Sequence, residues 1–161
     1  MKPMHLCRYH AQRIQNDETV AFRSWNEVTR RGKIAYTQCR LDAAKVYLLA
    51  AIEIYLLRVS VGKNALFSVA ALSHPLSILI ELFILENHFE EGVKLLSSIA
   101  SASRKNAVHD QHQLFDVLGQ HYEKLEIGEK TYFSATKSKN TFRQSDVISE
   151  ASVSTYHSHT L

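Results

Sequence analysis

Apolar residues recur at intervals of three and four positions along much of the chain, with polar breaks between the runs. One run consists of Leu76, Leu79, Ile80 and Phe83, and after the break Glu86-Asn87-His88 another run starts at Phe89. This spacing places apolar side chains on one face of an α-helix. Only five Gly and two Pro occur in 161 residues, whereas an all-β chain would need many turn residues. The pattern therefore predicts an all-α fold.

Small residues mark a predicted close contact between two helices. Counting from Gly32, Ala44 and Ala51 follow 12 and 19 positions later. Two antiparallel helices that cross closely need small side chains at the contact points. We therefore expect a helical hairpin here, with its turn near Cys39 and its second helix running from Leu41 to about Val59.

Two further units follow with a related pattern. In the second unit, Gly92 takes the position of Ala44, while bulkier Ile80 and Ile99 take the positions of Gly32 and Ala51. The third unit carries Leu118-Gly119-x-x-Tyr122 and continues less regularly through residues 127–133. Residues 137–161 are rich in Ser and poor in periodic apolar residues, which predicts a disordered tail or at most a short helix near residues 146–151.

These spacings resemble the tetratricopeptide repeat (TPR) family over residues 22–136, and more loosely its short bacterial members. The resemblance implies a TPR-like domain over residues 1–136, built as a right-handed stack of antiparallel helical hairpins that forms an α-α superhelix. Its repeats would cover about residues 25–58, 73–106 and 112–136.

The resemblance also implies a concave groove lined by the first helix of each hairpin, which is the usual docking surface of such stacks. Carried over position by position, the groove residues would be Asn26, Thr29, Lys33, Tyr36, Ser77, Glu81, Asp116, Gln120 and Glu123. They form a surface with one basic end and a more acidic far end, suited to a peptide or partner helix with basic character toward the third unit. The same residues are equally compatible with an ordinary solvated helix face.

Charge adds a second possibility. The formal net charge is +3, and residues 1–45 contain nine Lys or Arg against four acidic residues. Such an excess can attract phosphate or an acidic protein, or it can belong to a solvated helix face. A nucleic-acid-associated regulator would use Arg8, Arg13, Arg23, Arg30, Arg31, Lys33 and Arg40, but aromatic platforms and a recognition-helix motif are missing from the sequence.

Motifs for catalysis, cofactors and metals are missing or incomplete. The groups His5-x-Cys7-x-x-His10, His109-x-x-His112 and His157-x-His159 each lack the second ligand pair of a zinc site. Gly-x-Ser-x-Gly and the Gly-rich phosphate-binding loops do not occur. We therefore expect no enzyme activity, no cofactor and no metal.

Location and partners follow from the remaining features. Two cysteines and a polar N-terminus fit a reducing cytoplasm. The most apolar window, residues 65–85, contains Ser, His and Glu and so predicts a buried helix preceded by a loop rather than a membrane span. The connection between the first two repeats would cover residues 59–73 and contain Gly62-Lys63-Asn64. The sequence predicts a protein-interaction module that binds a protein or peptide. A secretion-type chaperone, for which the length and repeat count are similar, and a self-associating subunit remain as alternatives.

Overall fold

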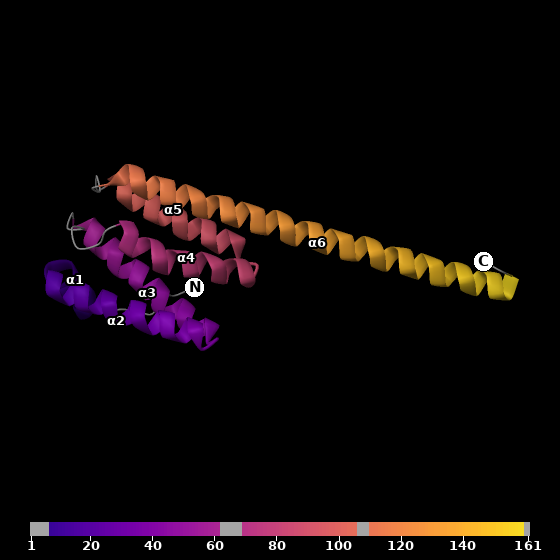
Figure 1. Cartoon of the computed structure of the whole chain (residues 1–161), viewed down its shortest axis with the longest axis horizontal. Helices are drawn as coiled ribbons and strands as arrows, with labels where there is room; N and C mark the ends of the chain where they lie inside the picture. Colours follow the sequence, from indigo (N-terminus) through magenta and orange to yellow (C-terminus); the bar gives the residue numbers. More distant parts are fainter. Residues whose placement is uncertain (1–6, 62–68, 106–109, 160–161) are drawn as a thin grey trace. The chain divides into compact units, whose positions relative to one another are not determined.

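The computed structural model describes residues 7–61, 69–105 and 110–159, with side chains described as far as residue 137. Within these ranges the chain forms helices and no strand, which confirms the predicted all-α class (Figure 1). The helices are α1 (Arg8–Asn16), α2 (Glu18–Thr37), α3 (Leu41–Ser60), α4 (Val69–Leu85), α5 (Phe89–Lys105) and α6 (Gln111–His159). The chain divides into two compact bodies, Met1–Leu125 and Glu126–Leu161.

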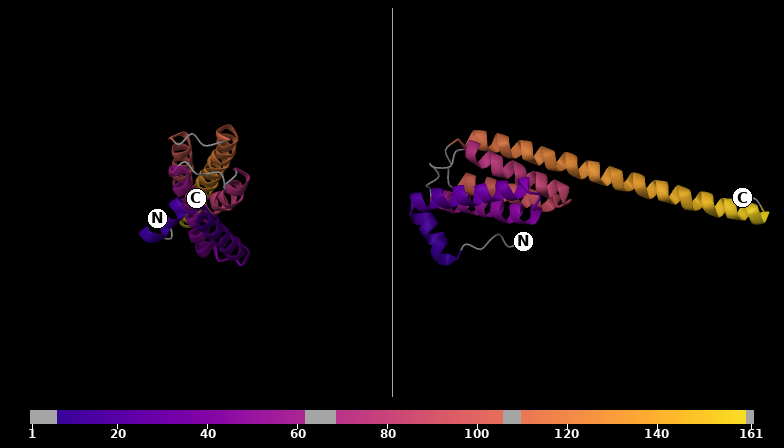
Figure 2. Two further views of the ribbon diagram at one scale, coloured as in Figure 1. Left: turned by 90° about the vertical axis from the view of Figure 1, so that its left-hand side faces the viewer. Right: turned by 60° about the horizontal axis from the view of Figure 1, so that its bottom comes forward.

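A single capping residue separates the first two helices. The carboxylate of Asp17 accepts hydrogen bonds from the backbone N–H groups of Thr19 and Val20, at 2.9 and 3.3 Å. These bonds satisfy two of the amide groups that the start of a helix leaves without a partner. α1 lies at an angle to α2 (Figure 2), and its residue Ile14 is fully buried. α2 therefore starts at Glu18, seven residues before the expected start of the first repeat.

The predicted first hairpin is present, and α3 matches the expected second helix almost residue for residue. Gly32 on α2 is buried, and Ala44 and Ala51 on α3 are fully buried. A Cβ atom placed on Gly32 would lie 2.7 Å from Cγ of Leu48, which is closer than real Cβ contacts. The two helices thus approach closely where the small residues predicted it.

The turns of the two hairpins have the same backbone structure. Cys39 and Asn87 have positive φ angles of 58° and 59°. The residue after each of them donates a backbone hydrogen bond of 2.8 Å to the carbonyl five residues back, Arg40 to Ala35 and His88 to Phe83. This is the Schellman motif that ends many helices. The first helix of each of these two hairpins therefore ends in the same way.

α4 begins earlier than the sequence predicted. We expected a loop up to residue 73, whereas α4 starts at Val69 and contains Pro75 in its interior. Val69 and Leu72 are 7% and 1% exposed and extend the apolar stripe of the helix into the core. Their burial offsets the cost of a proline inside a helix. The centre of the predicted connection, residues 62–64, lies outside the described residues.

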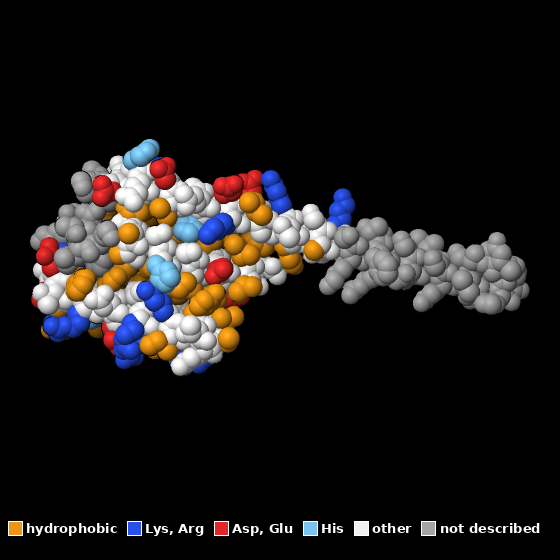
Figure 3. Space-filling view, viewed as in Figure 1, with side chains coloured by type: hydrophobic (Ala, Val, Ile, Leu, Met, Phe, Trp, Pro, Cys, Tyr) orange, Lys and Arg blue, Asp and Glu red, His pale blue; other side chains and the backbone are white. Residues whose placement is uncertain are grey.

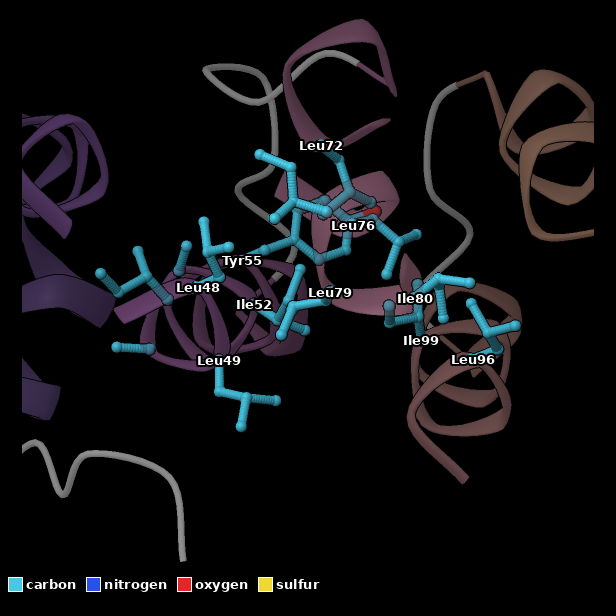
Figure 4. Packing of buried hydrophobic residues seen from close by; sticks show 14 of the residues in the cluster. Leu48, Leu49, Ile52, Tyr55, Leu72, Leu76, Leu79, Ile80, Leu96 and Ile99 are labelled. Atoms are coloured by element: carbon cyan, nitrogen blue, oxygen red, sulfur yellow. The ribbon is translucent and has the colours of Figure 1, made fainter. Parts of the chain in front are cut away.

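The core of the body Met1–Leu125 lies where α4 packs between α3 and α5. In Figure 4, Leu79 of α4 points toward Ile52 of α3, while Ile80 lies beside Ile99 of α5. α3 contacts both α4 and α5, and α2 contacts both α3 and α4. These contacts join α2, α3, α4 and α5 around a common core.

The expected third repeat, residues 112–136, and the expected tail, residues 137–161, fall almost entirely within a single helix. α6 is one helix from Gln111 to His159, without a turn between its two expected halves and without a break at residue 137. The first part of α6 packs closely on α5. A Cβ atom placed on Gly92 of α5 would lie 2.8 Å from Cδ2 of Leu125 on α6. In the body Glu126–Leu161, Lys130 pairs with Glu126 at 3.0 Å and Thr131 donates to the Ile127 carbonyl at 2.8 Å. Such bonds one turn apart support a continuous helix.

Candidate interaction surfaces

A hydrogen bond joins two of the residues that the sequence predicted for a binding groove. The Tyr36 hydroxyl of α2 donates to Oε2 of Glu81 on α4 over 2.9 Å. Glu81 is exposed and Tyr36 is half-buried. This bond raises the pKa of Tyr36, because the hydroxyl must stay protonated to donate to a carboxylate, and partial burial adds to the shift. The structure thus brings the first helices of the first two units together at exposed polar side chains.

The other predicted residues of these two helices lie along the same stripes, with one exception. Asn26 and Lys33 are exposed and Ser77 is half-buried. Thr29 is only 8% exposed, so the expectation that it lines an open groove is wrong. It lies one turn from Gly32, on the side of α2 that is buried, and a side chain there is not available to a partner.

Three predicted residues lie on the first part of α6. Asp116, Gln120 and Glu123 are exposed, and their spacing of four and three residues puts them on one helix face. A carboxylate oxygen of Asp116 lies 3.7 Å from the imidazole of His112, which gives an ion pair when the histidine is protonated. We call the first helix of each predicted hairpin its A helix. The A-helix surface then consists of the eight predicted groove residues that are exposed or half-buried on α2, α4 and α6, which are Asn26, Lys33, Tyr36, Ser77, Glu81, Asp116, Gln120 and Glu123.

Charge is unevenly distributed over this unit. In Figure 3, Lys and Arg side chains gather over α1 and α2, while Asp and Glu side chains lie along the upper edge, over the first part of α6. Part of the basic excess is neutralised within α2, because Glu27 pairs with both Arg30 and Arg31. These two hydrogen-bonded guanidinium groups, that of Arg31 foremost, lower the pKa of Glu27 and keep it ionised.

An open pocket of about 310 Å³ lies on α3 and α5, the second helices of the two hairpins. This pocket was not predicted from the sequence. It is lined by Leu49, Ile52, Glu53, Leu56, Phe83, Glu91, Lys94, Leu95 and Ser98, and we call it the α3–α5 pocket. In Figure 4, Leu49 points away from the α4 side chains. The signal available in the sequence was that α3 has apolar residues on more than one face, and this excess needs another neighbour.

The described part of the chain offers little for metal or thiol chemistry. No group of three or more His, Cys, Asp or Glu side chains among the described residues could hold a metal ion. His5 and His109 of the predicted groups lie outside those residues, and the side chains of His157 and His159 are not described. Cys7 and Cys39 are exposed free thiols.

Two further findings concern the chain as a whole. None of the helices, as far as the chain is described, combines the length and the apolar character needed to cross a membrane. Comparisons with protein-family models, with curated proteins and with solved structures found no match to this chain.

Proposed function

We propose that this protein is a non-catalytic interaction module of TPR-like architecture, which binds a peptide or a partner protein on its A-helix surface. The observation that carries the proposal is the hydrogen bond between Tyr36 and Glu81. It links the polar stripes of α2 and α4 into one surface, and it orders two side chains that a partner can contact. Ordered polar side chains cost a partner less entropy on binding than mobile ones.

The charges of this surface indicate the kind of partner. Lys33 lies on α2, whereas Glu81, Asp116 and Glu123 lie on α4 and α6. A partner with an acidic part near Lys33 and a basic part toward α6 would meet opposite charges along its length. Such complementarity raises the association rate and suppresses wrong partners.

A capture experiment with a matched control tests this function. The full chain and a Lys33→Glu, Glu81→Lys, Glu123→Lys variant would be used to capture proteins from an extract of the native cell, with identification by mass spectrometry. The control is Lys105→Glu, Asp42→Lys, Glu129→Lys, which makes the same charge changes at exposed positions outside the A-helix surface. Proteins retained by the chain and the control but lost from the first variant support the proposal. Equal retention by all three would contradict it.

The nucleic-acid alternative has a separate test. The ion pairs of Glu27 with Arg30 and Arg31 reduce the charge that α2 can offer to phosphate. We therefore expect labelled DNA or RNA to bind weakly. Micromolar binding that falls steeply as salt is raised would favour the regulator instead, because phosphate contacts release counterions.

A further inference from the structure

The α3–α5 pocket has the shape of a short groove between two helices. Its α3 residues are Leu49, Ile52, Glu53 and Leu56, and its α5 residues are Glu91, Lys94, Leu95 and Ser98. Each set follows the spacing i, i+3, i+4, i+7, so each helix contributes one stripe about two turns, or about 10 Å, long. The two stripes face a common space, which has the length of two turns of a third helix.

The floor of this groove is apolar. Phe83, from α4, is 1% exposed, and Ile52 and Leu49 are 1% and 8% exposed. Leu56 and Leu95 are half-buried and complete the walls. Apolar side chains spaced three or four residues apart on a partner helix would fill such a groove, as in the common helix-in-groove mode of recognition.

The charged groups around the apolar floor are mainly acidic. Glu53 and Glu91 line the pocket together with Lys94, and Lys94 pairs with Glu90 over 3.3 Å. The pocket lining therefore carries two acidic residues against one basic residue. A partner with Lys or Arg beside its apolar residues would meet opposite charge at this rim, whereas an acidic partner would be repelled.

We infer that the α3–α5 pocket binds one amphipathic helix of a partner protein, which places apolar side chains on Phe83 and Leu95 and Lys or Arg side chains beside Glu91. This second surface lies on the opposite members of the hairpins from the A-helix surface, and it does not depend on the function proposed above.

The test uses a synthetic helical peptide and the full chain. The peptide carries Leu at positions i, i+3, i+4 and i+7 with Lys at the flanking positions, and a second peptide has Glu in place of every Lys. Fluorescence anisotropy of the labelled peptides measures their affinity at low and at physiological ionic strength. We expect saturable binding of the Lys peptide and much weaker binding of the Glu peptide.

Two pairs of variants locate the site. Glu91→Lys changes the rim and Leu95→Asn changes the wall, while Glu129→Lys and Leu85→Asn make the same changes at exposed positions outside both the pocket and the A-helix surface. We expect Glu91→Lys to weaken binding of the Lys peptide about tenfold, since it turns an attraction into a repulsion. Leu95→Asn should weaken it at least as much. Circular dichroism confirms that each variant remains helical.

Several outcomes would overturn the inference. These are no binding of the Lys peptide, equal affinity for the two peptides, or equal weakening by Glu91→Lys and Glu129→Lys. Light scattering adds one more: a dimer that Glu91→Lys dissociates would show that a second copy of the chain occupies the pocket. Loss of Lys-peptide binding in the Lys33→Glu, Glu81→Lys, Glu123→Lys variant, with unchanged binding in Glu91→Lys, would place the peptide on the A-helix surface and would also overturn the inference.

Discussion

Glycine residues in this chain occupy two opposite environments within helices. Gly32 is buried where α2 meets α3, and a Cβ atom there would lie 2.7 Å from both Cγ and Cδ2 of Leu48. Leu48 is itself fully buried and cannot easily move. Gly119 on α6 is exposed, and a Cβ atom there would meet nothing within 4 Å. The same substitution should therefore have opposite effects at the two positions.

We expect Gly32→Ala to lower the free energy of unfolding by about 1 kcal/mol, because overpacking costs about 1–3 kcal/mol and the better helix propensity of Ala returns about 1 kcal/mol. Gly119→Ala should raise it by up to about 1 kcal/mol through propensity alone. Urea denaturation followed by circular dichroism measures both. Stabilisation by Gly32→Ala as large as that by Gly119→Ala would contradict the close approach of α2 and α3.

The turn residue Cys39 offers a second test at this scale. Its φ of 58° is unfavourable for any residue with a Cβ atom, and its side chain is exposed. Cys39→Gly should raise the free energy of unfolding by about 1 kcal/mol, and Asn87→Gly by about half as much, because Asn tolerates this conformation better. Cys39→Ala serves as the control and should bring no gain. If glycine and alanine at position 39 give the same denaturation midpoint, the left-handed turn is not formed.

Among the helices, α1 is held by one buried cation. Arg58 of α3 is fully buried, and its Nη1 donates to the backbone carbonyls of Gln15 and Ile14 at 2.8 and 3.3 Å. Its Nη2 lies 3.4 Å from Oε1 of Glu18. The last carbonyls of a helix lack partners within the helix, and they carry the negative end of its dipole. A guanidinium group at this point therefore fixes the end of α1 on α3.

Replacing Arg58 should release α1 before the remaining helices. Arg58→Met keeps the length of the side chain but removes its donors, and we expect the free energy of unfolding to fall by about 2–3 kcal/mol. Hydrogen exchange should show lost protection in α1 while α3 and α5 remain protected. Glu18→Gln removes a carboxylate that is 59% exposed and should cost less than about 1 kcal/mol. Unchanged exchange in α1 of Arg58→Met would show that its apolar contacts suffice.

At the scale of the whole molecule, the sequence predicted the features that depend on local spacing. The helical class, the close contact at Gly32 and the turn at residues 86–88 all follow from periodicity, small residues and polar breaks. The first hairpin could be placed because its close contact demands small side chains at fixed intervals.

The remaining features depend on which neighbour a residue meets. Gly119 matches the position of Gly32, but α6 has no turn after it, so no second helix packs there and the space beside it is open. Thr29 is polar yet buried, because the position of a residue on the helix face decides its exposure. The α3–α5 pocket arises from two helices that are far apart in the sequence, and no local pattern encodes their distance.

Stability of the whole molecule should depend on pH through His121 of α6. This side chain is 4% exposed, and its Nδ1 makes no hydrogen bond within the described residues. Burial lowers its pKa, with a smaller contribution from nearby Lys124, because both disfavour the charged imidazole. The unfolded chain therefore binds this proton more tightly than the folded protein does.

The sign of the pH effect follows from that difference. The contribution of His121 is fully present above its unfolded pKa of about 6.5 and is lost as the pH falls from there toward its lower folded pKa, by up to about 1.4 kcal/mol for each pH unit between the two values. Urea denaturation between pH 8 and pH 5 should therefore show a smaller decrease in stability for His121→Leu than for the unchanged chain. His112→Leu, which removes a 96% exposed imidazole from the same helix, should follow the unchanged chain. Parallel curves for His121→Leu and the unchanged chain would mean that water reaches the buried ring, and that α6 does not seal this side of the core against α5.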